Sequence, residues 1–345
     1  MRELVAALAA RGDAHAYRLY CRTPAAIEGL DERFSWVAVD RPDPLWHVAT
    51  ARRANRECDV FLSTNSYLTA WLLRIPTAVM VYDLIPFVPG AQAQSRAARI
   101  ERATLGRAVK RADALLCISE ATRRDLVARR PAAAGKATVV PLAAHPRFAR
   151  ERSEDELAGV RTRLGLPDSF VLSVGTLEPR KNLARLVEAY AGLPAEVRDA
   201  HPLVLAGPKG WEIDRLLAEL AAQDTDVRVL GFVEDEDLAA LYSLCTVFAY
   251  PSLYEGFGLP VLEALAAGAP TITSSVSSLP EVGGDAAVYV DPLQVSEIRG
   301  ALEELLRSPE RRAQLAARGR ERAAGYSWDR TAGVVLDALE AISRS

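Results

Sequence analysis

Two glutamates stand at a spacing that suits hydrogen bonding to a ligand rich in hydroxyl groups. Glu255 and Glu263 have seven residues between them, and the intervening loop carries Gly256 and Gly258. A sugar ring offers hydroxyl protons, and a charged acceptor binds such a proton more strongly than a neutral one. An ordinary loop carboxylate at Glu255 and a helix-dipole partner at Glu263 would explain the same residues. From these residues alone, both explanations stay open.

Arg180 and Lys181 are a second candidate pair. They follow an apolar run and Gly175, and we expect a helix to begin just after them, at Asn182 or a neighbour. Positive side chains oppose the dipole at a helix start, so their placement makes sense if an anion binds there. The alternative is a solvated basic pair in a loop. The chain has only four lysines, so a lysine beside an arginine at this position is less likely to be there by chance.

The segment 251–270 predicts the structure that would position the glutamates. It follows an apolar run at 246–250 whose β-branched and aromatic content favours a buried strand. Gly256 and Gly258 permit a tight loop, Pro260 suits the first turn of a helix, and Gly268 suits its end. A strand, a glycine loop and a helix start leave backbone N–H groups and a positive helix end for a ligand.

The rest of the chain alternates strands with helices, which predicts parallel sheets with right-handed crossovers. We expect an α/β protein of two doubly wound, Rossmann-like domains, with ligands at the carboxyl ends of strands that face a cleft between them. The polar stretch 147–169 marks the link, so the expected domains are residues 1–150 and 151–325, with a last helix at 326–345. The expected strands are 17–21, 36–39, 59–63, 77–81, 114–118 and 137–140 in the first half, and 170–174, 203–206, 227–230, 246–250, 271–273 and 287–290 in the second.

Asp83 and Ser119 are candidates in the first half because each follows an expected strand. Asp83 is a polar residue among apolar ones, so it is either a satisfied turn carboxylate or a group that addresses an acceptor hydroxyl. Ser119 is equally plausible as a helix cap.

Composition bounds the function. The 345 residues carry a formal net charge of −3, which gives no overall reason to expect nucleic acid. The four cysteines are far apart and lie in or beside apolar runs, which indicates buried free thiols in a reducing compartment. No apolar run is long enough to span a bilayer and the first residues do not resemble a signal peptide. We expect a cytoplasmic protein.

Three further signals carry less weight. Asp224 and Asp226 form an Asp-x-Asp pair that suits a metal, but turn residues surround it. The four histidines show no ligand spacing; His145, near the link, is better explained as a solvated loop residue. Basic residues between Arg96 and Arg111 fall mostly on one helical face, where a solvated surface is favoured over contact with anionic lipid.

These motifs together resemble glycosyltransferase family 4, the retaining enzymes with a Glu-x7-Glu signature. The resemblance is strongest from Ser173 to Pro292 and implies a GT-B fold whose last helix crosses back to the first domain. It implies that Arg180, Lys181 and the backbone of 256–259 hold the donor diphosphate. Glu255 would bind the sugar hydroxyls and Glu263 the ribose. The implied donor-binding residues are Gly175, Thr176, Val233, Gly256, Phe257, Gly258, Leu259 and Glu263, and the acceptor-side residues are Asp83 and Ser119.

The implied reaction moves a hexose from a nucleotide diphosphate sugar to a hydroxyl, with retention and without a metal or other cofactor. The segment Tyr82-Asp-Leu-Ile-Pro86 resembles mannosyltransferase-like members, which favours GDP-mannose. A glycan, a lipid-linked sugar or a small molecule would serve as acceptor. A non-catalytic nucleotide-sugar-binding protein or partner subunit is the alternative, and a nucleotide-sugar epimerase is a weaker one.

The sequence departs from the family at two places. Family members usually begin with a strand and a glycine-rich loop before the helix that starts here at Arg2, and this chain lacks both. We therefore expect either a start assigned too late or a truncated first sheet. The segment 140–145 also lacks the glycine that the family pattern predicts.

Overall fold

The computed structural model describes residues 1–64, 67–88, 96–210 and 227–344, which form two compact units. Unit 1 comprises Met1–Leu142 and Ser327–Ser345, and unit 2 comprises Ala143–Tyr326. The first boundary lies at Leu142 instead of residue 150 because the segment after it packs into unit 2. Phe148 is buried there and meets the ring of Tyr242 edge-on, with centroids 5.7 Å apart.

Unit 2 contains a parallel sheet in the order β12-β11-β10-β7-β8-β9. Its strands are β7 (Val171–Val174), β8 (Leu203–Ala206), β9 (Val227–Gly231), β10 (Val247–Tyr250), β11 (Thr271–Ser274) and β12 (Ala287–Val290). Its helices are α6 (Glu154–Leu164), α7 (Leu183–Ala191), α8 (Ala195–Ala200), α10 (Asp235–Leu244), α11 (Leu259–Ala267), α12 (Leu279–Gly283), α13 (Val295–Arg307) and α14 (Pro309–Ala324), with short 3-10 turns η3 (Pro146–Phe148) and η4 (Pro179–Lys181).

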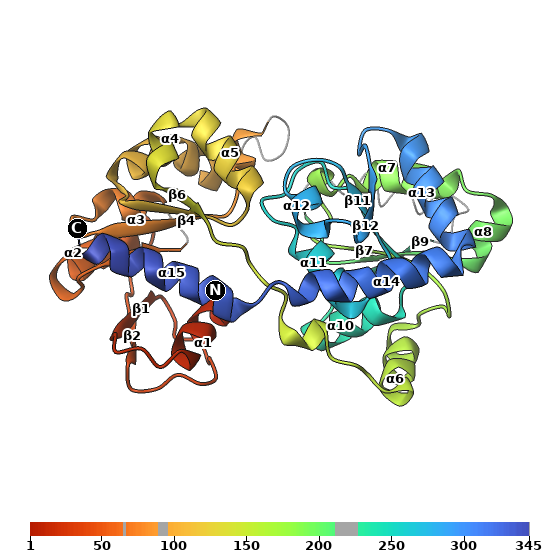
Figure 1. The fold of residues 1–345 in the computed structure, drawn as a ribbon, viewed down its shortest axis with the longest axis horizontal. Helices are drawn as coiled ribbons and strands as arrows, with labels where there is room; N and C mark the ends of the chain where they lie inside the picture. Colours follow the sequence, from red (N-terminus) through yellow and green to blue (C-terminus); the bar gives the residue numbers. More distant parts are fainter. Residues whose placement is uncertain (65–66, 89–95, 211–226, 345) are drawn as a thin grey trace. The chain divides into compact units, whose positions relative to one another are not determined.

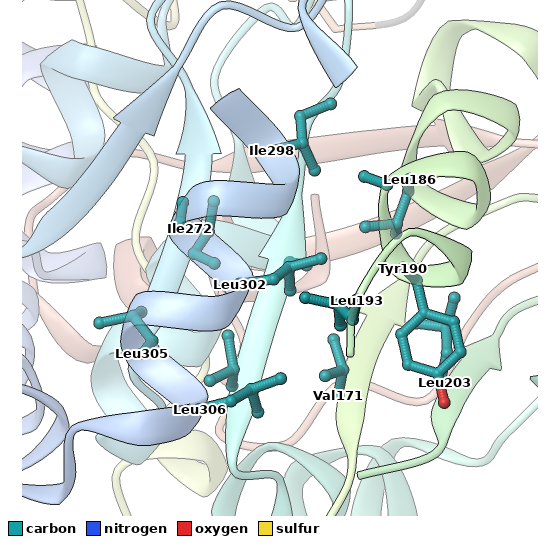
Figure 2. Close-up of a cluster of buried hydrophobic side chains, with 14 of the residues drawn as sticks. Val171, Leu186, Tyr190, Leu193, Leu203, Ile272, Ile298, Leu302, Leu305 and Leu306 are labelled. Carbon is teal, nitrogen blue, oxygen red and sulfur yellow. The ribbon is translucent and has the colours of Figure 1, made fainter. Parts of the chain in front are cut away.

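The core of unit 2 lies between this sheet and the helices α7 and α13. Ile298, Leu302 and Leu305 of α13 are fully buried. Figure 2 shows them in one cluster with Leu186 and Tyr190 of α7, against the strands of the sheet. Because the strands are covered by helices, β7, β8 and β10 are apolar along most of their length, as parallel sheets require.

Within its described residues, unit 1 contains two parallel sheets where we expected one. β1 (Tyr17–Cys21) pairs with β2 (Phe34–Ala38), and β3 (Phe61–Ser63), β4 (Thr77–Val81), β5 (Ala114–Cys117) and β6 (Ala137–Val139) pair in that order. The expectation of a single sheet is wrong because β1 and β3 do not pair with each other. The helices are α1 (Arg2–Ala10), α2 (Leu45–Glu57), α3 (Tyr67–Leu72), α4 (Arg96–Arg111), α5 (Glu120–Arg129) and α15 (Trp328–Ser343), with 3-10 turns η1 (Ile85–Phe87) and η2 (Pro131–Lys136).

The last helix, α15, belongs to unit 1, although unit 2 lies between it and the rest of that unit in the sequence. It begins after Ser327, whose side chain accepts a hydrogen bond from the Arg330 amide at 3.2 Å. It packs against α1, β4 and β5, and Arg11 donates to Asp329 at 2.6 Å. Figure 1 shows α15 in dark blue beside the red α1.

Candidate active site

The strand order of unit 2 defines where a ligand can bind. β7 and β10 are neighbours in the sheet. From β7 the chain adds β8 and β9 on one side, and from β10 it adds β11 and β12 on the other, so the direction of strand addition reverses between β7 and β10. In open parallel sheets the crevice outside the carboxyl ends of the strands at such a reversal is the usual ligand site. Gly175–Asn182 follow β7 and Pro251–Gly258 follow β10, so the candidate residues of the sequence meet at this point.

Glycines bring the backbone close together beside β7. Gly175 and Gly207 adopt φ values of 137° and 144°. A Cβ atom at Gly207 would lie 2.1 Å from the carbonyl oxygen of Gly175, and one at Gly175 would lie 3.1 Å from Lys181 Cε. The turn therefore needs glycine at both positions, and it leaves Thr176 exposed at its tip.

The side chains of Arg180 and Lys181 converge on Glu255. Lys181 Nζ and Arg180 Nη1 each lie 2.7 Å from Glu255 Oε1. Tyr250 and Ser252 donate their hydroxyls to the same oxygen at 2.8 and 2.7 Å. The Lys181 ammonium also donates to the Tyr250 hydroxyl.

Further contacts fix the arginine of this cluster. Arg180 Nη2 donates to Glu178 Oε1 at 2.5 Å, and Arg180 Nη1 donates to the Tyr254 carbonyl at 2.8 Å. About a tenth of each side chain, of Arg180, Lys181, Glu178 and Glu255, is exposed. The result is a nearly buried group of two cations and two carboxylates.

For Glu255, Arg180 and Lys181, burial and the neighbouring charges act on the pKa in opposite directions. Burial alone would raise the pKa of Glu255, but Lys181 and Arg180 outweigh burial and lower it. Burial would lower the pKa of Arg180, but Glu255 and Glu178 raise it. For Lys181, burial prevails and lowers the pKa of the ammonium, because Arg180 opposes the effect of Glu255. The site therefore offers positive charge that is already desolvated.

The loop after Glu255 is held by two serines. The Glu255 amide donates to Ser277 Oγ at 3.0 Å, and Ser278 Oγ donates to the carbonyls of Glu255 and Phe257 at 2.9 and 2.7 Å. Gly258 has a φ of 104° and precedes α11 as its N-cap, so the first amides of α11, from Leu259 onward, point out of the helix end.

Glu263 lies on α11 and is half-buried. Its Oε2 accepts a hydrogen bond from the hydroxyl of Tyr242 at 3.1 Å. Burial raises the pKa of Glu263 to about 7, although the bond from Tyr242 acts in the opposite direction. Val233, two residues beyond the end of β9, is half-buried beside Phe232, whose side chain is 68% exposed.

Several residues of the cluster were not among those predicted from the sequence. Tyr250 and Tyr242 resemble ordinary core residues in the sequence, and both are buried. Ser252 and Glu178 lie two or three residues from predicted site residues, and this proximity was the only signal available. Their roles depend on contacts between β7 and β10 that the sequence does not show.

The two candidates of unit 1 follow adjacent strands. Asp83 comes after β4 and Ser119 after β5. Asp83 Oδ1 accepts a hydrogen bond from the Ile85 amide at 2.8 Å, which makes it a turn carboxylate whatever else it contacts. Ser119 caps α5 by accepting from the Thr122 amide at 3.0 Å.

Part of the basic face of α4 has a structural role. Arg111 donates to the carbonyls of Leu73 and Ile75 at 2.6 and 2.8 Å. The guanidinium of Arg107 lies 4.8 Å from the ring centroid of the exposed Trp71. These two basic residues therefore tie α4 to α3 and the turn that follows it.

The remaining sequence signals have simple outcomes. His145 accepts a hydrogen bond from the Arg147 amide at 3.0 Å and begins η3. The cysteines are free; Cys117 and Cys245 are buried, and Cys21 and Cys58 are half-buried. Asp224 and Asp226 lie outside the described residues. Among the described helices, none combines the length and apolar character that crossing a bilayer requires.

Comparison with known proteins agrees with this geometry. The family described as glycosyl transferases group 1 matches residues 161–322, and the family described as glycosyltransferase family 4 matches residues 1–147. The solved structure of sucrose-phosphate synthase from Thermosynechococcus elongatus is similar with a TM-score of 0.80, at 23% identity over 99% of this chain and 92% of that one. WaaG, a glycosyltransferase involved in lipopolysaccharide biosynthesis, is similar with a TM-score of 0.77, at 18% identity over 98% of this chain and 94% of that one. The expected GT-B fold is therefore confirmed.

Two relatives are closer in sequence. O-antigen chain mannosyltransferase B from Escherichia coli is 33% identical over 327 residues, which cover 92% of this chain and 81% of that protein. Serotype-specific mannosyltransferase WbdA, also from Escherichia coli, is 35% identical over 241 residues, which cover 68% of this chain but only 30% of that much longer protein. The chain therefore belongs to the group 1 glycosyltransferases of family 4, and it is a glycosyltransferase.

Proposed function

We propose that the protein transfers mannose from GDP-mannose to an acceptor hydroxyl, with retention of configuration and without a metal ion. The observation that carries this proposal is the buried cluster in which Arg180 and Lys181 meet Glu255 at the carboxyl ends of β7 and β10. A desolvated pair of cations beside a helix N-terminus suits a diphosphate.

The chemistry requires the anomeric carbon to lose its bond to the diphosphate oxygen and to gain one to the acceptor oxygen on the same face. The sugar carbon becomes cationic as negative charge develops on the leaving group. Arg180, Lys181 and the amides at the start of α11 would stabilise that negative charge, and because they are fixed beforehand they need little reorganisation. The proton of the acceptor hydroxyl would pass to the departing phosphate.

Glu255 and Glu263 would bind the rest of the donor. The contacts of the Glu255 carboxylate to Arg180, Lys181, Tyr250 and Ser252 are all made by Oε1, so Oε2 is the oxygen that we assign to the sugar hydroxyls. Glu263, on the next turns of α11, would accept from the ribose hydroxyls. Gly175 and Thr176 would lie along the phosphates, and Val233 near the base.

The choice of mannose rests on the relatives. Two of them carry the name mannosyltransferase and come from Escherichia coli. An Anabaena structure with a TM-score of 0.76 contains UDP and glucose at only 18% identity, so UDP-glucose is the donor to compare. For the acceptor we propose a glycan, lipid-linked or small-molecule hydroxyl, with Asp83 and Ser119 on the acceptor side.

Peripheral contact with a membrane through α4 is part of the proposal, as is a cytoplasmic location. The exposed Trp71 beside Arg107 suits a lipid headgroup region. Vesicles with and without anionic lipid test the membrane contact. The fraction of protein that sediments with the anionic vesicles should fall when Lys110 and Arg99 are both replaced by Gln. Equal sedimentation of the parent and the double variant would contradict it.

The donor is tested by incubating the protein with GDP-mannose, UDP-glucose and other nucleotide sugars and measuring the released nucleotide with and without candidate acceptors. We expect release from GDP-mannose that persists in EDTA and a product of retained anomeric configuration. Binding without turnover would favour a nucleotide-sugar-binding subunit, and an isomerised donor would favour an epimerase.

A further inference from the structure

A buried tyrosine holds one of the two glutamates of the candidate site. Tyr242 lies on α10 and is fully buried, and its hydroxyl donates to Glu263 Oε2 at 3.1 Å. A buried tyrosine hydroxyl usually has a hydrogen-bond partner, whereas a phenylalanine would fill the same space without needing one. The hydroxyl at this position is therefore accounted for by the carboxylate of Glu263.

Rings from two other elements fix the direction of the Tyr242 hydroxyl. The ring of Phe148, in η3, meets the ring of Tyr242 edge-on with centroids 5.7 Å apart, and the ring of Phe248, in β10, does so at 5.2 Å. Both phenylalanines are buried. A ring held on two sides in a close-packed interior has little room to turn away, so the hydroxyl stays directed at Glu263.

The two carboxylate oxygens of Glu263 have different surroundings. Oε2 accepts from Tyr242, whereas no group among the described residues makes a hydrogen bond or an ion pair with Oε1. A carboxylate can accept hydrogen bonds through both oxygens. Because Oε2 is held, the carboxylate is restricted in its rotation, and Oε1 is the oxygen left for an incoming hydroxyl.

The surrounding charges leave the tyrosine as the main support for the ionised form of Glu263. Burial raises the pKa of Glu263 to about 7, and the hydrogen bond from Tyr242 is the largest influence in the opposite direction. Asp235 of α10 raises this pKa and Arg147 of η3 lowers it, and these two residues pair with each other at 3.1 Å. Burial raises the pKa of Tyr250, at the end of β10, well above its ordinary value, so this neighbour stays neutral.

We propose that Tyr242 is a positioning residue through which the enzyme selects ribonucleotide donors. Its hydroxyl holds Glu263 Oε2, so that Oε1 accepts from a ribose hydroxyl of the donor. A deoxyribonucleotide leaves that oxygen without its partner, and a site built to bind a hydroxyl rejects an analogue that lacks it. This inference rests on the ribose role proposed above for Glu263, and it gives Tyr242 no contact with the donor.

The test compares the binding of GDP with that of 2′,3′-dideoxy-GDP, which lacks both ribose hydroxyls. The quantity is the ratio of the two dissociation constants for the 345-residue chain, measured by titration calorimetry from pH 6 to 9. Both ligands carry the same diphosphate, so its titration and that of Lys181, whose pKa burial lowers, cancel in the ratio. For the parent we expect the ratio to rise with a midpoint near pH 7 and to reach at least about tenfold at pH 9.

Tyr242→Phe removes the hydroxyl and keeps the ring. The midpoint should move up by about one pH unit, because losing the hydrogen bond raises the pKa of Glu263 further. The ratio at pH 9 should fall at least about threefold, because the carboxylate is no longer oriented. Tyr190→Phe is the matched control: Tyr190 is also fully buried and donates to the Arg198 carbonyl at 3.1 Å, and this variant should keep the parent's ratio and midpoint.

A second variant decides the question if loss of the hydroxyl destabilises unit 2. Tyr242→fluorotyrosine keeps the ring and the hydroxyl, and fluorine makes the phenol a stronger donor, so the midpoint should move to lower pH. A parent that discriminates between the ligands, with Tyr242 variants that keep its ratio and midpoint, would overturn the role of Tyr242 alone; equal weakening of both ligands is the same outcome. A parent that binds both ligands equally would overturn the ribose role of Glu263, and the role of Tyr242 with it.

Discussion

Glu255 meets four side chains through a single oxygen, three by hydrogen bonds and Arg180 by an ion pair, and this arrangement explains how the cations of the site keep their positions. Arg180, Lys181, Tyr250 and Ser252 all reach Oε1. Ionised groups that are nearly buried are costly unless they are paired and hydrogen-bonded. The carboxylate meets that requirement before any ligand arrives, and an incoming diphosphate would supply further negative charge to the same two cations.

Replacing Lys181 by alanine should reduce kcat/KM for the nucleotide sugar by about 100- to 1000-fold, the effect typical of removing one preorganised charge-stabilising group. The free energy of unfolding should change little, because Arg180 remains paired with Glu255. Steady-state kinetics and urea unfolding measure the two quantities. Lys110→Ala, at an exposed position on α4, is the matched control: in the absence of lipid it should leave both kcat/KM and the free energy of unfolding unchanged. Unchanged turnover in Lys181→Ala would contradict the diphosphate role.

Nucleotide affinity should increase as pH rises from 6 to 8. In the ligand-free protein burial raises the pKa of Glu263 to about 7, and the ionised carboxylate is the better acceptor for ribose hydroxyls. With that pKa, roughly a tenth of Glu263 is ionised at pH 6 and roughly nine tenths at pH 8, so the apparent Kd for GDP should improve up to about tenfold. Titration calorimetry measures this dependence, which Glu263→Gln should flatten.

The same shift predicts a dependence of stability on pH. Between the unfolded pKa of about 4.3 and the folded value, the folded chain retains a proton that the unfolded chain releases, so the free energy of unfolding contributed by Glu263 falls as pH rises through this window. Urea unfolding of the Glu263→Gln variant should lack this part of the decline.

The ribose role itself depends on the affinity measurement: a parent protein whose GDP affinity is constant from pH 6 to 8 would rule it out.

At the scale of elements, the site depends on how strands end and helices begin. β7 and β10 each finish in a loop with a glycine at positive φ, and the next helix of each starts close by. Serines at 277 and 278, which precede α12, hold the carbonyls and the amide of the loop that follows β10. The loop that leads into α11 is thus held by residues that lie directly before α12.

Gly258→Ala should destabilise unit 2 by about 1–3 kcal/mol, since the position has a φ of 104° and a new Cβ would lie 2.8 Å from Leu279 Cδ2. Nucleotide affinity should fall with it, because α11 begins here. Gly300→Ala provides the control: it lies inside α13 with open space around it, and it should stabilise by about 0.5–1 kcal/mol. Chemical denaturation of both variants is the measurement, and equal effects would contradict the argument.

For the whole molecule, the notable feature is that one unit is built from both ends of the chain. α15 supplies Ala332, Val335 and Leu339 to the interior of unit 1. Thr331 also donates to the Pro141 carbonyl at 2.6 Å, near the end of the first segment of that unit. Unit 1 is therefore incomplete until the last residues of the chain are present.

Ending the chain at Tyr326 should unfold or strongly destabilise unit 1 while unit 2 keeps its own transition. The deletion removes the helix that covers Leu4 and Leu8 of α1 and exposes apolar surface at roughly 25 cal/mol per Å². Calorimetry together with hydrogen exchange of β4 and β7 separates the two units. A control chain ending at Ser343 keeps α15 and should behave as the parent; loss of structure at β7 in the longer deletion would contradict the division into units.

The sequence by itself determined the alternation of strands and helices, the glycine loop between Glu255 and Glu263, and the basic pair at Arg180 and Lys181. These features depend on short-range patterns: apolar runs, turn residues and helix-end residues act within a few positions of one another. Only the tertiary structure decided that Tyr250, Ser252 and Glu178 surround the two cations, because these contacts join the ends of β7 and β10. It also decided that the described strands of the first half form two sheets, since strand pairing depends on neighbours distant in the chain, which a local pattern does not specify.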